Sequence, residues 1–111
     1  MSKTIDINDV ELEQFQGRVF ADLAAGYGGV MISLGAKLGL YAALAGAGPL
    51  TSADVAQRTD CAERYVREWL NSQAAGGYLD YDRELKTYTL SPERAAVLAD
   101  PVNPAYLTPA F

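Results

Sequence analysis

The chain has 111 residues, of which 50% are hydrophobic and 21% charged, so we expect one folded domain rather than an intrinsically disordered chain. It contains no histidine and a single cysteine, Cys61, which excludes histidine-based acid–base catalysis, histidine zinc sites and a disulfide framework. A net charge of -5 disfavours unaided attraction to nucleic acid or to anionic lipid.

The N-terminal segment, MSKTIDIND, has no basic region that leads into an apolar stretch, as a secretory signal would. A lone thiol also fits a reducing compartment, so a cytoplasmic location is expected. We expect residues 1–7 to be disordered, residues 8–100 to form the domain and residues 101–111 to be a linker-like tail.

Residues 8–25 have the pattern of a helix, with Asn8 or Asp9 as the N-cap and acidic residues in the first turn. Apolar side chains recur every three or four residues and form one stripe, made of Leu12, Phe15, Val19 and Leu23. Phe20 and several alanines lie outside this stripe, so the helix is apolar on more than one side. We therefore expect more than one neighbour to bury it, and a partner subunit can be one of them.

Residues 23–53 contain one charged side chain, Lys37, so this segment is long and apolar enough to raise the question of a membrane span. It also contains seven glycines, and Lys37 lies near its middle, where inserting a charge costs about 2.5–3.5 kcal/mol. A helix buried in protein is therefore favoured, and no membrane partner is expected. Gly35 and Gly39 form a G-x-x-x-G spacing, which in soluble chains permits close helix packing.

A second helix is expected from Gly28 or Gly29 to Leu44, where an Ala-Gly-Ala-Gly-Pro segment stops it. Its inward face is predicted to carry Met31, Leu34, Leu38 and Tyr41 or Ala42.

Two capping-box patterns follow. Thr51 with Asp54 predicts a short helix over residues 53–58, and Asp60 with Glu63 predicts a longer one from Cys61 or Ala62 to Ala75. The longer helix is predicted to place along one side Tyr65, Trp69, Leu70 and Gln73, with Trp69 as a core anchor.

After Gly76-Gly77, two β-prone runs at residues 78–81 and 88–90 predict a hairpin with a polar loop. Ser91 as N-cap and Pro92 at the first position predict a last helix that ends near Leu98. This order is that of a winged helix-turn-helix, so the expected fold class is mainly α with a small β-hairpin, preceded by two helices of a dimerisation type.

Charge on the motif argues against its commonest use, which is DNA binding. Over residues 51–90 there are five basic and seven acidic side chains, whereas a duplex binder usually carries a basic footprint. Arg64 and Arg67 lie one turn apart and could read guanines, but the simpler interpretation pairs them with Glu68 and Glu63. Nucleic acid is therefore not the expected partner.

Three segments resemble the N-terminal region of a bacterial family of class I S-adenosylmethionine-dependent methyltransferases: LGLYAAL (38–44), AERYVREWLNSQAAGGY (62–78) and YTLSPERAAVLAD (88–100). The resemblance extends from about Phe15 to Phe111. It implies a winged-helix module for dimerisation and for covering the substrate, placed before a Rossmann-like catalytic domain. It also implies that Phe20, Tyr27 and Met31 line the mouth of the substrate pocket, although periodicity alone favours core packing for Met31.

The glycine-rich turn of such enzymes, about D/E-x-G-x-G-x-G after a strand, is absent from this sequence. The segment Gly26-Tyr27-Gly28-Gly29 has glycines at similar spacing, but no strand precedes it and no βαβ unit follows. We therefore expect no cofactor-binding, catalytic or metal-ligating residue in this chain. The apolar residues Tyr106, Leu107 and Phe111 in the tail suggest a fragment of a longer protein.

The sequence thus supports a non-catalytic domain of a methyltransferase that pairs with its twin through Leu12, Phe15, Val19 and Leu23. The complete enzyme is expected to transfer a methyl group from S-adenosylmethionine to a small-molecule acceptor. The alternative is a free-standing winged-helix transcription regulator that binds DNA as a dimer.

Overall fold

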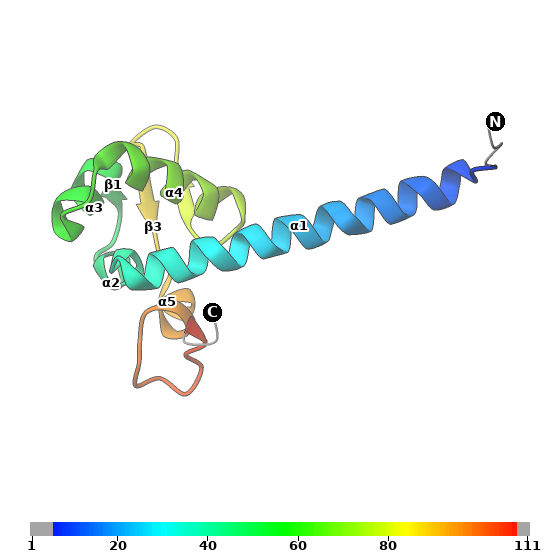
Figure 1. Cartoon of the computed structure of the whole chain (residues 1–111). Coiled ribbons are helices and arrows are strands. Elements are labelled where there is room, and N and C mark those ends of the chain that lie inside the picture. Colours follow the sequence, from blue (N-terminus) through cyan, green and yellow to red (C-terminus); the bar gives the residue numbers. More distant parts are fainter. Residues whose placement is uncertain (1–5, 109–111) are drawn as a thin grey trace.

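The computed structural model describes residues 6–108, which form a small helical domain with one long helix projecting from it (Figure 1). The elements follow the order α1 (Asp9–Lys37), α2 (Leu40–Leu44), β1 (Leu50–Thr51), α3 (Ser52–Thr59), α4 (Glu63–Ala75), β2 (Asp80–Asp82), β3 (Thr87–Thr89) and α5 (Pro92–Leu98). The predicted fold class, a mainly α winged helix-turn-helix with a β-hairpin, is confirmed.

Helix α1 is one continuous helix of 29 residues where the sequence predicted a break near residues 26–29. That prediction was wrong because an interior glycine costs a helix only about 1 kcal/mol and still donates its backbone N–H. The break occurs instead at Gly39, which adopts a left-handed φ of 73° and starts the short α2. At the other end, the Asn8 cap is confirmed, because its Oδ1 accepts hydrogen bonds from the backbone N–H groups of Val10 (3.0 Å) and Glu11 (3.1 Å).

The capping box predicted at the start of α3 is present. The Thr51 Oγ1 accepts from the Asp54 N–H at 3.2 Å, and the Asp54 carboxylate accepts from the Thr51 N–H at 3.0 Å. The hydrogen bond from the Thr51 backbone N–H, and after it the Thr51 side chain, lower the pKa of the Asp54 carboxyl group.

The second predicted capping box, Asp60 with Glu63, is absent, and that prediction was wrong. Asp60 adopts a left-handed φ of 55° and ends α3, while the N-cap position of α4 is Ala62, which has no side-chain cap. The Glu63 carboxylate is used across the turn instead, where it accepts a 2.5 Å hydrogen bond from the Ser52 hydroxyl. A contact between the two helices of the motif thus replaces the local cap.

The wing is a three-stranded antiparallel sheet in the order β1-β3-β2, with Tyr88 of β3 paired to Leu50 on one side and to Tyr81 on the other. The predicted hairpin is confirmed, and its loop spans residues 83–86. The two-residue strand β1 was not predicted. The predicted last helix is confirmed as α5, since the Ser91 Oγ accepts from the Arg94 N–H and Pro92 occupies the first turn.

The core lies between α2, α3, α4 and the sheet, and its most deeply buried side chains are Tyr41, Leu40, Leu44, Leu70 and Val55. Helix α4 faces this core with Val66, Trp69, Leu70 and Gln73. The prediction for Tyr65 was wrong, since it is 71% exposed and Val66 takes its place one position further round the helix. Trp69 is confirmed as a core residue, with 4% of its surface exposed.

Helix α1 is joined to the domain through a tight contact near its C-terminus. The Trp69 Nε1–H donates a 2.9 Å hydrogen bond to the Met31 carbonyl oxygen, and the Trp69 and Tyr41 rings meet edge to face at 5.0 Å. Gly35 lies against both rings, and a Cβ built there would come within 2.4 Å of Trp69 Cζ2 and 2.6 Å of Tyr41 Cε2. The two rings therefore pack directly on the α1 backbone at Gly35 and leave no room for a side chain there.

Residues after α5 turn back onto it. The Leu107 N–H donates to the Val97 carbonyl at 2.9 Å, and the Thr108 hydroxyl donates to the Leu98 carbonyl at 2.8 Å. Thr108 is 4% exposed and Leu107 is 59% exposed. That residues 101–111 lead to a further domain stays a prediction, and Phe111 lies outside the described residues, as do residues 1–5 of the predicted N-terminal tail.

The substitution Gly35→Ala is expected to lower the free energy of unfolding by about 1–3 kcal/mol, because the new methyl group overlaps two packed rings. Urea denaturation measures this loss. The control is Gly26→Ala, where a Cβ meets nothing within 4 Å, so the higher helix propensity of alanine should raise stability by about 0.5–1 kcal/mol. Equal effects from both substitutions would contradict the tight contact at Gly35.

Candidate interaction surface

The N-terminal part of α1 projects from the domain, and every residue from 9 to 27 is exposed (Figure 1). The molecule extends 63 Å along its longest axis, and its radius of gyration of 18.5 Å exceeds the value of about 13 Å expected for a compact domain of this length. Large apolar side chains cover this segment: Val10, Leu12, Phe15, Val19, Phe20, Leu23 and Tyr27. An apolar helix of this kind is usually covered by another molecule.

The four side chains predicted as a dimer interface all lie on this projecting segment. Leu12, Phe15, Val19 and Leu23 have exposed fractions of 52%, 64%, 42% and 67%. The sequence predicted burial by more than one neighbour, and the described part of this chain supplies none. Their role in pairing therefore stays a prediction.

Of the three residues expected at a substrate pocket, two lie together and the third lies apart from them. Phe20 is 74% exposed on the projecting segment, and it lines none of the three grooves considered below. Tyr27, the last residue of the projecting segment, and Met31, one turn further along α1, together line two adjacent grooves against α4. Periodicity favoured core packing for Met31, and its side chain is half-buried against the core.

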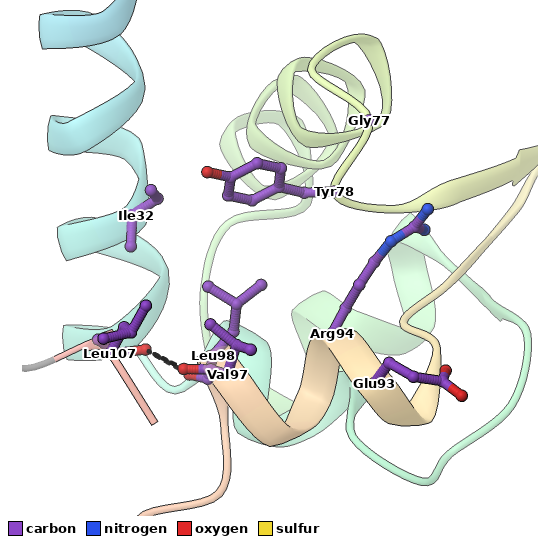
Figure 2. A pocket seen from close by; sticks show the side chains of 9 residues that line it. Ile32, Gly77, Tyr78, Glu93, Arg94, Val97, Leu98 and Leu107 are labelled. Atoms are coloured by element: carbon purple, nitrogen blue, oxygen red, sulfur yellow. Dashed lines mark hydrogen bonds between the residues drawn. The ribbon is translucent and has the colours of Figure 1, made fainter. Parts of the chain in front are cut away.

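One groove, of about 400 Å³, lies between α1 near Ile32, the turn after α4 and helix α5. Figure 2 shows Ile32 of α1 and Tyr78 facing each other across this space, with Val97 below them. Its outer edge carries Glu93 and Arg94, and the Arg94 guanidinium is held 3.1 Å from the Asp80 carboxylate. The groove is apolar inside and has a paired cation at its edge.

A second groove, of about 250 Å³, lies where α1 passes the C-terminal end of α4. Its lining comprises Ala24, Tyr27, Gly28, Met31, Ser72, Gln73, Gly76 and Tyr78. Gln73 is the polar core residue among them, with 5% of its surface exposed. Its Oε1 accepts a 2.5 Å hydrogen bond from the Tyr41 hydroxyl. Sequence periodicity indicated that Gln73 faces inward but gave no signal of this partner, which is 32 residues away.

The outer face of α4, which reads DNA in many winged-helix proteins, is neutralised by ion pairs within the helix. Arg64 Nε lies 3.9 Å from Glu68 Oε1, and Arg67 Nε lies 3.8 Å from Glu63 Oε2. These are the pairs that the sequence predicted at i, i+4 spacing. The two arginines therefore do not form a basic face of their own.

The two carboxylates on β2 have structural partners. Asp80 pairs with Arg94, and Asp82 Oδ1 accepts hydrogen bonds from the backbone N–H groups of Glu84 (2.9 Å) and Leu85 (3.1 Å). Within residues 6–108, no three His, Cys, Asp or Glu side chains are grouped as they would be around a metal ion. Cys61 is a free, partly buried cysteine.

Helix α1 is also long and apolar enough, by length and composition alone, to cross a membrane, with a mean hydropathy of 1.4 over its most apolar window. Its uncharged part, residues 23–36, would span only about 21 Å at 1.5 Å per residue, less than the roughly 30 Å of a hydrocarbon core. Ile32 and Gly35 within this part are buried against the domain. The geometry therefore favours protein contacts for α1.

Comparison with known proteins agrees with this fold. Residues 26–100 match the family described as the Rv2258c-like winged HTH domain, which covers well over half of the chain. The chain belongs to this family. No curated protein matches it at a significant level.

Two solved structures share the fold. The first is the mitomycin 7-O-methyltransferase MmcR, with a TM-score of 0.74 and 23% identity over 87% of this chain. The second is PigF with SAH, with a TM-score of 0.73 and 22% identity over 85% of this chain. The chain corresponds to 28% of the length of MmcR and 27% of that of PigF. The winged HTH domain is thus similar to the N-terminal domains of methyltransferases, as the resemblance implied.

Burial, and to a lesser extent the neighbouring Tyr78, raises the pKa of the Tyr41 hydroxyl above its ordinary value of 10.0. A raised pKa in the folded state means that the unfolded chain loses this proton first as the pH rises. The contribution of Tyr41 to the free energy of unfolding should therefore be constant below about pH 10 and fall above it. Burial also raises the pKa of the Tyr88 hydroxyl, so Tyr88 contributes in the same direction.

Tyr41→Phe is expected to reduce this alkaline loss of stability, and to cost about 1–2 kcal/mol at neutral pH because Gln73 Oε1 loses its donor. Urea unfolding at pH 8 and at pH 10.5 measures both effects. Tyr65→Phe is the control, since Tyr65 is 71% exposed, and it should behave as the parent protein does. An unchanged pH profile in Tyr41→Phe would contradict the burial of this hydroxyl.

Proposed function

We propose that this chain is the N-terminal dimerisation and substrate-covering domain of a cytoplasmic S-adenosylmethionine-dependent methyltransferase, without catalytic activity on its own. The fold shared with MmcR and PigF, and the length of this chain relative to both, support this role. In the complete enzyme a small-molecule acceptor would receive the methyl group from S-adenosylmethionine.

The described residues do not fit the cofactor. Class I enzymes hold it with a glycine-rich turn whose backbone N–H groups are free to approach the ligand. Here Gly26 and Gly28 lie inside α1, where backbone N–H groups are used by helical hydrogen bonds. Cofactor binding is therefore assigned to a part of the protein outside this chain.

The observation that carries the dimerisation role is the projecting, apolar segment of α1. In proteins most of the stability of a helix comes from packing of its apolar face, and residues 9–27 are exposed in the described chain. Covering its apolar side chains would stabilise the helix. Each Å² of apolar surface removed from water contributes about 25 cal/mol of favourable free energy.

A second copy of the chain is the partner that fits best, because the four side chains of the stripe are spaced almost equally in both directions along the helix. In a two-fold pair each surface meets itself, so residue i contacts residue j and j contacts i. An antiparallel arrangement of two α1 helices places Leu12 against Leu23 and Phe15 against Val19. Every large side chain of the stripe then has an apolar partner.

Sedimentation of the purified chain is expected to show a dimer. Phe15→Asp should weaken dimerisation by about 30-fold or more, because a charge replaces an aromatic side chain in the centre of the interface. The matched control is Val102→Asp, which alters a side chain that is 90% exposed and follows α5 in the chain. A monomer at high concentration, or equal effects of both substitutions, would refute pairing through α1.

A DNA-binding regulator is the competing function for a winged helix-turn-helix. The ion pairs on α4 and the net charge of -5 argue against it. We expect no gel shift with mixed-sequence duplex DNA at low salt and protein concentrations up to about 100 µM, where counterion release most favours binding. A shift that weakens steeply with added salt would instead support the regulator.

A further inference from the structure

The groove between α1 and the end of α4 contains a buried amide with one end unused by the protein. Gln73 is 5% exposed, and its Oε1 is occupied by the Tyr41 hydroxyl at 2.5 Å. Its Nε2 donates no side-chain hydrogen bond to any residue that the structure describes. No fully buried side-chain nitrogen or oxygen in that part of the chain lacks a partner, so Nε2 must reach the open space of the groove that Gln73 lines.

The walls of this groove suit a flat, uncharged ring. The aromatic side chains of Tyr27 and Tyr78 and the thioether of Met31 line it, and Gly28 and Gly76 contribute backbone without side chains. None of the lining residues carries a charge. A volume of about 250 Å³ accommodates a ring system of two or three fused rings.

We propose that this groove binds a neutral, planar aromatic molecule that presents a hydrogen-bond acceptor, with Gln73 Nε2 as the donor that orients it. The Tyr41 hydroxyl fixes the amide by holding Oε1, so the N–H groups are already directed at the groove before a ligand arrives. The binding site does not depend on the methyltransferase role. Identifying its ligand with the methyl acceptor rests on the proposed function.

Dimerisation and binding can take place together, because they use different sides of α1. At 100° per residue, the stripe of Leu12, Phe15, Val19 and Leu23 is centred about 120° around the helix axis from Tyr27, Gly28 and Met31. A second copy packed on the stripe would leave the groove accessible.

The test is titration of the ¹⁵N-labelled chain with coumarin, whose carbonyl accepts hydrogen bonds, and with indole, of similar size, which only donates one. Coumarin should shift the Gln73 side-chain NH₂ resonances in a saturable way, with a Kd of about 1 mM as expected for a fragment of this size. Indole should bind about fivefold more weakly, which is the contribution of one hydrogen bond.

Gly28→Leu should abolish the coumarin shift by filling the groove, and it should not unfold the chain, because a Cβ at this helical position meets nothing within 4 Å. Gly26→Leu is the matched control, since it has equal space and lines none of the described grooves, and it should bind coumarin as the parent does. No shift of the Gln73 amide, equal affinities for coumarin and indole, or full binding by Gly28→Leu would overturn the site. Sedimentation of the same samples reports dimerisation separately, so failure of one proposal is distinguishable from failure of the other.

Discussion

The contact of Gly35 with the rings of Trp69 and Tyr41 is the constraint on which the rest of this structure depends. Trp69 belongs to α4 and Tyr41 to α2, so this contact joins the long helix to both parts of the domain core. The hydrogen bond from the Trp69 indole to the Met31 carbonyl fixes α1 along its axis. The direction in which α1 leaves the domain, and the grooves on either side of it, follow from this contact.

Two surfaces of the domain differ in chemistry and therefore in the partners that they suit. On α4, the arginines that would contact phosphate are paired with glutamates in the same helix, so that face attracts nucleic acid weakly. On α1, large apolar side chains are exposed over several turns, a pattern typical of protein contacts. A fold best known for reading DNA thus presents a surface suited to assembly with protein.

Local signals in the sequence predicted well those elements whose ends are decided locally. Helices α3 and α5 have caps within three residues of their starts, and the pairs Arg64–Glu68 and Arg67–Glu63 follow from helical spacing alone. The start of α4 was mispredicted because Glu63 bonds to Ser52, eleven residues away, in place of a local cap.

Elements that depend on contacts between distant residues could not be predicted from local signals in the sequence. Strand β1 has two residues and exists only through its pairing with β3. The continuity of α1 through its glycines was missed because each interior glycine costs a helix only about 1 kcal/mol and does not end it. The helix ends only near Gly39, where the backbone adopts a left-handed φ. Similarly, the orientation of the Gln73 amide depends on Tyr41, so sequence periodicity identified the residue as buried but not as part of a groove.

The projecting part of α1 is also a lever arm. Its nineteen residues from 9 to 27 measure about 28 Å, while the helix is held near one end, at Ile32 and Gly35. The distance from residue 9 to that contact is about 35 Å, so a tilt of about 10° there would move the far end by roughly 6 Å, slightly more than the rise of one helical turn. The packing of a single glycine against two aromatic rings therefore sets the register in which anything docks at the distant tip.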